Sequence, residues 1–135
     1  MNHRVLQPGG WPRPRGYANG VSARGRMVFV AGQIGWNAQG ALAGPDLVSQ
    51  ARQALHNIVT ILAEDGAQPK DLVRLTWFVA DRDVYVAAAR ELGEAYRGIM
   101  GAHYPAMSVV EVSALIEEGA VVEIEATAVV PEEGA

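Results

Sequence analysis

The chain has 135 residues, 50% of them hydrophobic, which is enough for one domain spanning residues 1–135 but too few for two. Eleven basic and fifteen acidic residues give a net charge of -4, which disfavours nucleic acid as a partner because phosphate binders usually carry a basic surface. The absence of cysteine excludes disulfides and cysteine-ligated zinc, and the absence of an apolar run near the roughly 18 to 20 residues of a membrane span predicts a soluble, cytoplasmic protein without a membrane partner.

The N-terminal third contains an arm, strands and a loop. Residues 1–20 are so rich in glycine and proline that regular helix is excluded, and we expect an irregular arm there. Residues 21–34 are rich in β-branched and apolar side chains, which predicts either a strand pair or one strand with a turn near residues 24–26. Glycine and asparagine between residues 35 and 45 then indicate a loop.

The middle of the chain predicts two units of a strand and a helix. Pro45 and Asp46 suit the first turn of a helix that runs to about residue 65, and Gly66 suits its end. Residues 72–79 alternate as in a strand, and Asp81 is a candidate N-cap for a second helix that ends near residue 101. The apolar positions of the first helix recur at steps of three and four, on one face: Leu47, Ala51, Ala54, Leu55, Ile58 and Leu62.

The last third predicts two further strands. Residues 108–115 and 120–130 are β-rich and are joined by a short polar segment, which favours a terminal hairpin. The order of elements predicts an α+β sandwich, in which two helices cover one face of a mixed sheet. Residues 121–126 alternate apolar and partly polar side chains, so the other face meets either water or another subunit.

Five blocks of the sequence resemble, in order, the signatures of the Rid family of reactive intermediate deaminases, also known as the L-PSP endoribonuclease family. The blocks are residues 16–20, 30–34, 50–58, 103–112 and 122–126. The resemblance implies a chorismate mutase-like fold and a homotrimer with small-molecule pockets at the subunit boundaries. It also implies hydrolysis of small 2-imino or 2-amino-alkenoic acids to keto acids and ammonia, without a metal or an organic cofactor.

The same resemblance suggests which residues form the pocket. By the matched positions, Tyr17 would close the pocket, Ala31 and Gly32 would present backbone groups, and Val109 would line the side on which water is bound. Glu123 would be the catalytic carboxylate that orients the water. Residue 125 is also a glutamate and points to the same face of the strand as Glu123, so which of the two faces the pocket stays open.

Met107 stands where the family usually has the arginine that grips the substrate carboxylate. A thioether carries no charge and donates no hydrogen bond, whereas arginine offers a planar fork that matches a carboxylate. Loss of a buried pair of this kind costs about 2 to 5 kcal/mol, which is enough to change the substrate. The alternative is that Met107 only fills the core at the start of a strand.

Two further residues are candidates for the pocket. Arg90 falls on the second helix where family members often place a polar pocket residue, so it either supplies the missing cation or faces solvent. Trp36 is a candidate for the pocket wall. The three histidines lack the spacing of a metal site, so no metal is expected.

The sequence therefore predicts a divergent Rid-type deaminase of small reactive enamines or imines, whose substrate preference is altered at Met107. A non-catalytic trimer that binds a small molecule is the alternative. An endoribonuclease is the weaker alternative, because the charge is acidic and no ladder of aromatic residues for base stacking accompanies the N-terminal arginines.

Overall fold

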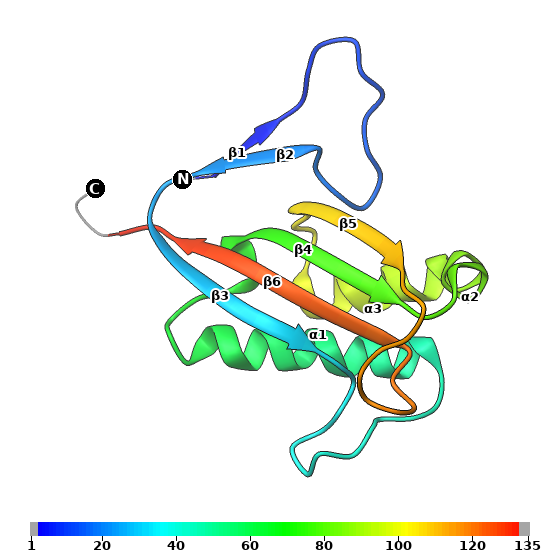
Figure 1. Cartoon of the computed structure of the whole chain (residues 1–135). Coiled ribbons are helices and arrows are strands. Elements are labelled where there is room, and N and C mark those ends of the chain that lie inside the picture. Colours follow the sequence, from blue (N-terminus) through cyan, green and yellow to red (C-terminus); the bar gives the residue numbers. More distant parts are fainter. Residues whose placement is uncertain (1–2, 133–135) are drawn as a thin grey trace.

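Four strands form the central sheet of the protein, which the computed structural model describes over residues 3–132 (Figure 1). In spatial order these strands are β3 (Arg26–Gln33), β6 (Val122–Val130), β4 (Leu72–Val79) and β5 (Ala106–Glu111). Strand β6 is antiparallel to both of its neighbours, whereas β4 and β5 are parallel. The sheet is therefore mixed, as predicted.

The predicted terminal hairpin is wrong, because β4 lies between β5 and β6 and pairs with both. Every second residue of β6 from Val122 to Ala128 is buried, which suits a central strand, while β5 has only half-buried or exposed residues and forms an edge. Alternation of side chains identifies a strand but not its partner. The connection over residues 112–121 is long enough to pass the end of β4.

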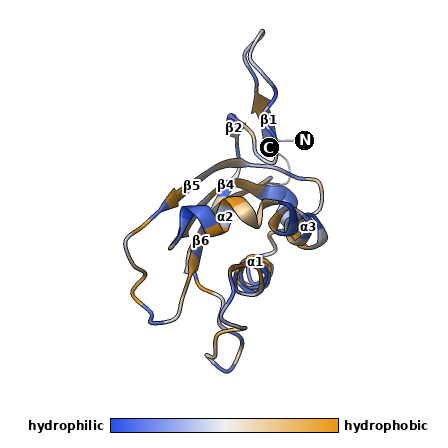
Figure 2. Cartoon of the chain, turned by 90° about the vertical axis from the view of Figure 1, so that its right-hand side faces the viewer, coloured by the Kyte–Doolittle hydropathy of each residue, from blue (hydrophilic) through white to orange (hydrophobic). Residues whose placement is uncertain are grey.

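Helix α1 (Leu47–Ala63) covers one face of the sheet (Figures 1 and 2). Asp46 is its N-cap rather than part of its first turn, and the Asp46 carboxylate accepts a hydrogen bond of 3.0 Å from the backbone N–H of Ser49. The chain leaves the helix through Gly66, whose φ of 70° favours glycine. All six apolar positions predicted for the inner face of α1 are buried.

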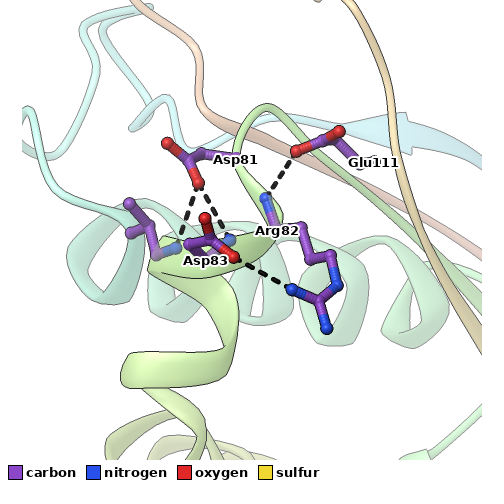
Figure 3. Close-up of polar contacts among 5 residues, drawn as sticks. Asp81, Arg82, Asp83 and Glu111 are labelled. Carbon is purple, nitrogen blue, oxygen red and sulfur yellow. Dashed lines mark hydrogen bonds and ion pairs between the residues drawn. The ribbon is translucent and has the colours of Figure 1, made fainter.

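The second helix is two helices, α2 (Arg82–Ala87) and α3 (Ala89–Met100), which are separated at Ala88. Alanine is a strong helix former, so no local signal marks this break. As predicted, Asp81 caps α2 and accepts hydrogen bonds from two backbone N–H groups of its first turn (Figure 3). The carboxylate of Glu111 accepts a third bond of 2.7 Å from the backbone N–H of Arg82, which ties α2 to the end of β5 (Figure 3).

The N-terminal arm is not irregular throughout, because β1 (His3–Leu6) pairs with β2 (Gly20–Ala23) in a separate sheet that projects beyond β5 (Figure 1). Glycine and proline exclude helix from this arm, but most of them lie in the segment between the two strands, where they do not disturb the pairing. Two strands, β2 and β3, occupy most of residues 20–33, where either a strand pair or one strand with a turn was predicted. They belong to different sheets, however, and do not pair with each other.

The two faces of the central sheet differ in polarity. The inner face of β6 packs on the helices through Val122, Ile124 and Ala126, which are buried, while Glu123 and Glu125 point to the outer face. The described helices leave that outer face uncovered (Figure 2). It also exposes large apolar side chains, Met27 by 56%, Phe29 by 70% and Val110 by 44%. Among residues 3–132, no helix has both the length and the hydropathy to cross a membrane.

Candidate functional site

A cavity of about 450 Å³ lies at the β5 edge of the sheet, between the sheet, α3 and the N-terminal arm. Three of the residues predicted for the pocket line it: Tyr17, Met107 and Val109. Ala31, Gly32, Trp36, Arg90 and Glu123 do not line it.

Tyr17 reaches the cavity because the following residue docks on the start of β5. The backbone N–H of Ala18 donates a hydrogen bond of 2.9 Å to the carbonyl of Pro105, and Ala18 forms a parallel bridge with Ala106. Ala18 is buried, while Tyr17 beside it is 42% exposed. A short backbone contact thus holds the tyrosine ring at the mouth of the cavity, although Tyr17 itself belongs to no strand or helix.

Met107 and Val109 point into the cavity because they lie on the inner face of β5. They are in register with Leu75 and Trp77 of β4, which are both buried under the helices. Alternate residues of a strand share a face, so residues 108 and 110 point to the outer face instead. Both Met107 and Val109 are half-buried, since β5 is the edge strand and the cavity opens there.

Aromatic rings form most of the interior of the cavity. The rings of Tyr96 and Tyr104 stack with centroids 5.5 Å apart, and the Tyr96 hydroxyl donates a hydrogen bond of 2.7 Å to the carbonyl of His103. Burial raises the pKa of Tyr96 far above its usual value, so this ring is neutral at physiological pH. Trp77 packs edge-on against Tyr85 at 6.2 Å. These rings give the interior of the cavity an uncharged lining.

The cations at the cavity are Arg15 of the arm and Arg97 of α3, neither of which the sequence singled out for the pocket. The sequence pointed instead to Arg90, which lies outside the cavity. Its side chain is 92% exposed and pairs with Glu94 at 3.5 Å, so it has the solvent-facing role that was the alternative reading. The spacing of Ala89, Gly93 and Arg97 places Arg97 on one helix face with two small residues, but only the fold shows that this face lines the cavity.

Gly32 and Glu123 form a second cluster, on the outer face of the sheet. Between Val30 and Gln33 the register of β3 against β6 shifts, so Ala31 and Gly32 lie in a β-bulge and both are exposed. A bulge frees backbone groups from the ladder of hydrogen bonds. The Glu123 carboxylate lies directly over Gly32, where any Cβ would overlap it. This contact places the Glu123 carboxylate over Gly32, while Glu125 is the residue of β6 opposite the bulge.

Trp36 lies in the loop after β3, where it forms a bridge with Leu42 and accepts a hydrogen bond of 2.9 Å from the Asn57 side chain on its carbonyl. Its side chain is 40% exposed and lies apart from the cavity.

A single chain therefore does not assemble the predicted site. Tyr17, Met107 and Val109 lie at the inner face of the sheet, and Gly32 and Glu123 lie at the outer face. Side chains on opposite faces of one sheet cannot act on the same small molecule. Within residues 3–132, no three His, Asp or Glu side chains are grouped as a metal site would require.

The chain is similar to known proteins over most of its length. The family pattern described as Endoribonuclease L-PSP matches residues 12–130. A 2-iminobutanoate/2-iminopropanoate deaminase of Escherichia coli strain K12 is 36% identical over 113 residues, which cover 84% of this chain and 86% of that protein. The RutC family protein PM1466 of Pasteurella multocida is 35% identical over 105 residues, which cover 78% of this chain and 81% of that protein.

Solved structures are similar in fold as well as in sequence. A protein of unknown function of the conserved Rid protein family, YyfB from Yersinia pestis, superposes with a TM-score of 0.85 at 36% identity, over 96% of this chain and all of that one. The YjgF gene product of Escherichia coli superposes with a TM-score of 0.69 at 34% identity, over 93% of this chain and 98% of that one. The cavity and the Glu123 cluster both lie within the matched region.

Proposed function

The chain belongs to the Rid family, also called the L-PSP endoribonuclease family, and we propose that it hydrolyses small reactive enamines or imines with a substrate preference altered at Met107. The observation that carries this proposal is the placement of the Glu123 carboxylate over the freed backbone of Gly32. The similarity to deaminases of 2-imino acids supports the same reaction class.

The proposed site forms between subunits of a homotrimer. The cavity with Tyr17 and Met107 and the cluster with Gly32 and Glu123 lie on opposite faces of the sheet, so each needs the other from a second copy. The exposed apolar side chains of the outer face, Phe29 above all, suit burial in such an interface.

The reaction proposed for this site is hydrolysis of a C=N bond. Water adds to the carbon of the C=N bond, and the carbinolamine that forms expels ammonia to leave a carbonyl group. In this scheme Glu123 takes a proton from the attacking water and passes it to the imine nitrogen, which gives the carbinolamine. Glu123 then transfers the proton of the carbinolamine hydroxyl to the nitrogen as the C–N bond breaks. Backbone groups at Ala31 and Gly32 hold the water in line with the carbon. No step uses a metal or an organic cofactor, and this absence stays a prediction, as does the cytoplasmic location.

The experiment is ammonia release from freshly generated imino acids of increasing chain length, measured against spontaneous hydrolysis in buffer. We expect accelerated hydrolysis for a bulkier member of the series and little acceleration for 2-iminobutyrate. Acceleration of 2-iminobutyrate to the level reached by the Escherichia coli deaminase would refute the altered preference. If no imine in the series is hydrolysed faster than in buffer, the deaminase proposal itself fails.

Met107→Arg tests the residue on which the altered preference rests. An arginine here would supply a planar guanidinium that binds the carboxylate of a short 2-imino acid. We therefore expect turnover of 2-iminobutyrate to rise about 30-fold or more. Met107→Leu is the matched control, since it keeps the apolar character and should leave this turnover unchanged. An arginine variant that keeps its oligomeric state and gains nothing would contradict the role given to Met107.

A non-catalytic trimer that binds a small molecule is the second candidate, and the uncharged interior of the cavity favours it. A thermal-shift screen of metabolites, followed by turnover assays on every compound that stabilises the protein, separates binding from catalysis. Salt-dependent binding and cleavage of RNA would revive the endoribonuclease, against which the acidic charge argues.

A further inference from the structure

We propose that Arg97, assisted by Arg15, is the anion anchor of this cavity, and that its ligand is a carboxylate with an apolar or aromatic body. This inference rests on the proposed function, because it names the substrate class of the same site. The two arginines are exposed, whereas Trp77 is only 3% exposed and Met107 is half-buried. Charge therefore lies at the mouth of the cavity and apolar surface lies inside.

Helix α3 directs Arg97 to the cavity by its spacing. Five residues of this helix line the cavity, and they recur at steps of three and four, which places them on one face: Ala89, Leu92, Gly93, Tyr96 and Arg97. Arg90 follows Ala89 by one residue and is turned away toward Glu94. Two arginines of one helix thus have opposite surroundings.

Gly93 makes room for the guanidinium of Arg97. A Cβ built at residue 93 would lie 3.2 Å from Nη1 of Arg97, so the arginine folds back over the preceding turn of α3. Ala89, one further turn back, is also small and lines the cavity. Small side chains at these two positions keep the path from Arg97 to the cavity open.

Neither cavity arginine has an acidic partner among residues 3–132. Three other arginines of the chain do: Arg26 pairs with Asp65, Arg82 with Asp83 and Arg90 with Glu94. Two unpaired guanidinium groups at one opening repel each other, and an anion between them removes this repulsion. A carboxylate fits the planar fork of a guanidinium.

The interior of the cavity selects the rest of the ligand. Met107 is a soft, adaptable side chain, and the stacked rings of Tyr96 and Tyr104 offer a flat apolar wall. An aromatic or branched aliphatic body buries apolar surface there, while a two- or three-carbon chain buries little. Because residue 107 is a methionine and not an arginine, the interior offers no cation to a carboxylate. The proposed ligand therefore binds with its carboxylate at the mouth of the cavity and its apolar body inside.

The test is calorimetric binding of three stable probes to the wild-type oligomer. These are 3-phenylpropanoate, its neutral amide 3-phenylpropanamide, and propanoate, which lacks the ring. We expect 3-phenylpropanoate to bind most tightly of the three. Arg97→Gln should weaken 3-phenylpropanoate about 10-fold and leave the amide unchanged, because only the acid uses the cation. Arg97→Lys should restore part of the affinity, and Arg15→Gln should have a smaller effect than Arg97→Gln.

Arg90→Gln is the matched control, with the same change of charge on the same helix. It should bind all three probes as the wild type does, and circular dichroism verifies that each variant is folded. Equal affinity for the acid and the amide, or equal losses in the Arg97 and Arg90 variants, would overturn the anchor. Arginine-dependent binding without any imine turnover would leave the anchor standing and reject the deaminase. Turnover that ignores Arg97→Gln would do the reverse.

Discussion

Glu123 shows how a single residue acquires a candidate role from its neighbour. Its carboxylate lies over the backbone of β3 only because residue 32 has no side chain, and the register of β3 against β6 shifts beside it at Ala31 and Gly32. Glu125, two residues further on the same face, is in register with Thr76 and lies opposite the bulge in the ladder, but the carboxylate that lies over Gly32 is that of Glu123. The two glutamates of β6 therefore have different surroundings, and only Glu123 is proposed as the catalytic carboxylate.

Glu123→Gln tests this difference. Glutamine keeps the shape of the side chain but cannot take a proton, so we expect imine turnover to fall by about 100-fold or more with little loss of stability. Glu125→Gln is the matched control and should stay within about 3-fold of the wild type. The measurement is ammonia release from the best imine substrate. If the two variants lose activity equally, the assignment of the catalytic carboxylate to Glu123 is wrong.

Some of the site residues predicted from the sequence lie together in the structure, and others do not. Tyr17, Met107 and Val109 line one cavity, and all three were predicted from motifs that match the family. Arg90 lies outside this cavity, because the face of α3 that lines it carries Arg97 instead. Periodicity of an uninterrupted helix does not contain that information.

At the scale of elements, Gln50 of α1 connects two loops to the core. Its side chain is fully buried, and its amide N–H groups donate to the carbonyls of Gly44 and Gly119 at 2.8 and 2.9 Å. Its carbonyl accepts a bond of 2.8 Å from the backbone N–H of Val121. The loops before α1 and before β6 are therefore held by one side chain, next to the start of β6, the strand that carries Glu123.

Gln50→Leu should destabilise the protein by about 3 kcal/mol, because the three hydrogen bonds of this fully buried side chain are lost together. The measurement is denaturant unfolding at one fixed protein concentration, since an oligomer gains stability with concentration. Gln39→Leu, in the exposed loop before α1, is the control and should change the free energy of unfolding by less than about 0.5 kcal/mol. Equal effects would show that the buried bonds contribute nothing.

Asp46 gives α1 a pH-dependent contribution to stability. Hydrogen bonds from Ser49 lower the pKa of Asp46 below its usual 3.8. A lowered pKa in the folded state means that the stabilisation is present above pH 3.8 and is lost as pH falls through the lowered value.

Asp46→Ala should therefore cost about 1 kcal/mol at neutral pH, and the difference from the wild type should shrink below pH 3.8. Asp46→Asn keeps an N-cap oxygen that does not titrate, so it should be nearly as stable as the wild type at neutral pH. Thermal unfolding from pH 7 to pH 2.5 measures both variants. A constant difference between Asp46→Ala and the wild type across this range would contradict the charged cap.

At the scale of the whole molecule, the candidate site is divided between the two faces of one sheet. The cavity opens at the β5 edge under the helices, and the Glu123 cluster lies on the face that the helices leave uncovered. That face also exposes Phe29 by 70%. The proposed association of copies of this chain would bring the two parts of the site together. It would also bury the apolar surface that the helices leave uncovered.

Phe29→Glu should break the proposed trimer, because a charge in the middle of the buried interface is left without a partner. We expect light scattering to report the mass of a single chain, and imine turnover to fall by about 100-fold because Glu123 no longer faces a cavity. Val86→Glu, on the exposed surface of α2, is the control and should leave both mass and turnover unchanged. A monomeric wild type, or a monomeric variant with full turnover, would reject the shared site.

The sequence by itself determined the family and those elements that local patterns define. Local patterns suffice for α1 with its buried face, for β4 over residues 72–79, for the Asp81 cap and for the polar and apolar faces of β6, because each depends on neighbours within a few residues along the chain. Only the tertiary structure decided that β4 separates β5 from β6, that β1 pairs with β2, and that Arg97 rather than Arg90 reaches the cavity. These depend on contacts between residues far apart in the chain, whose pairing energies no local pattern records.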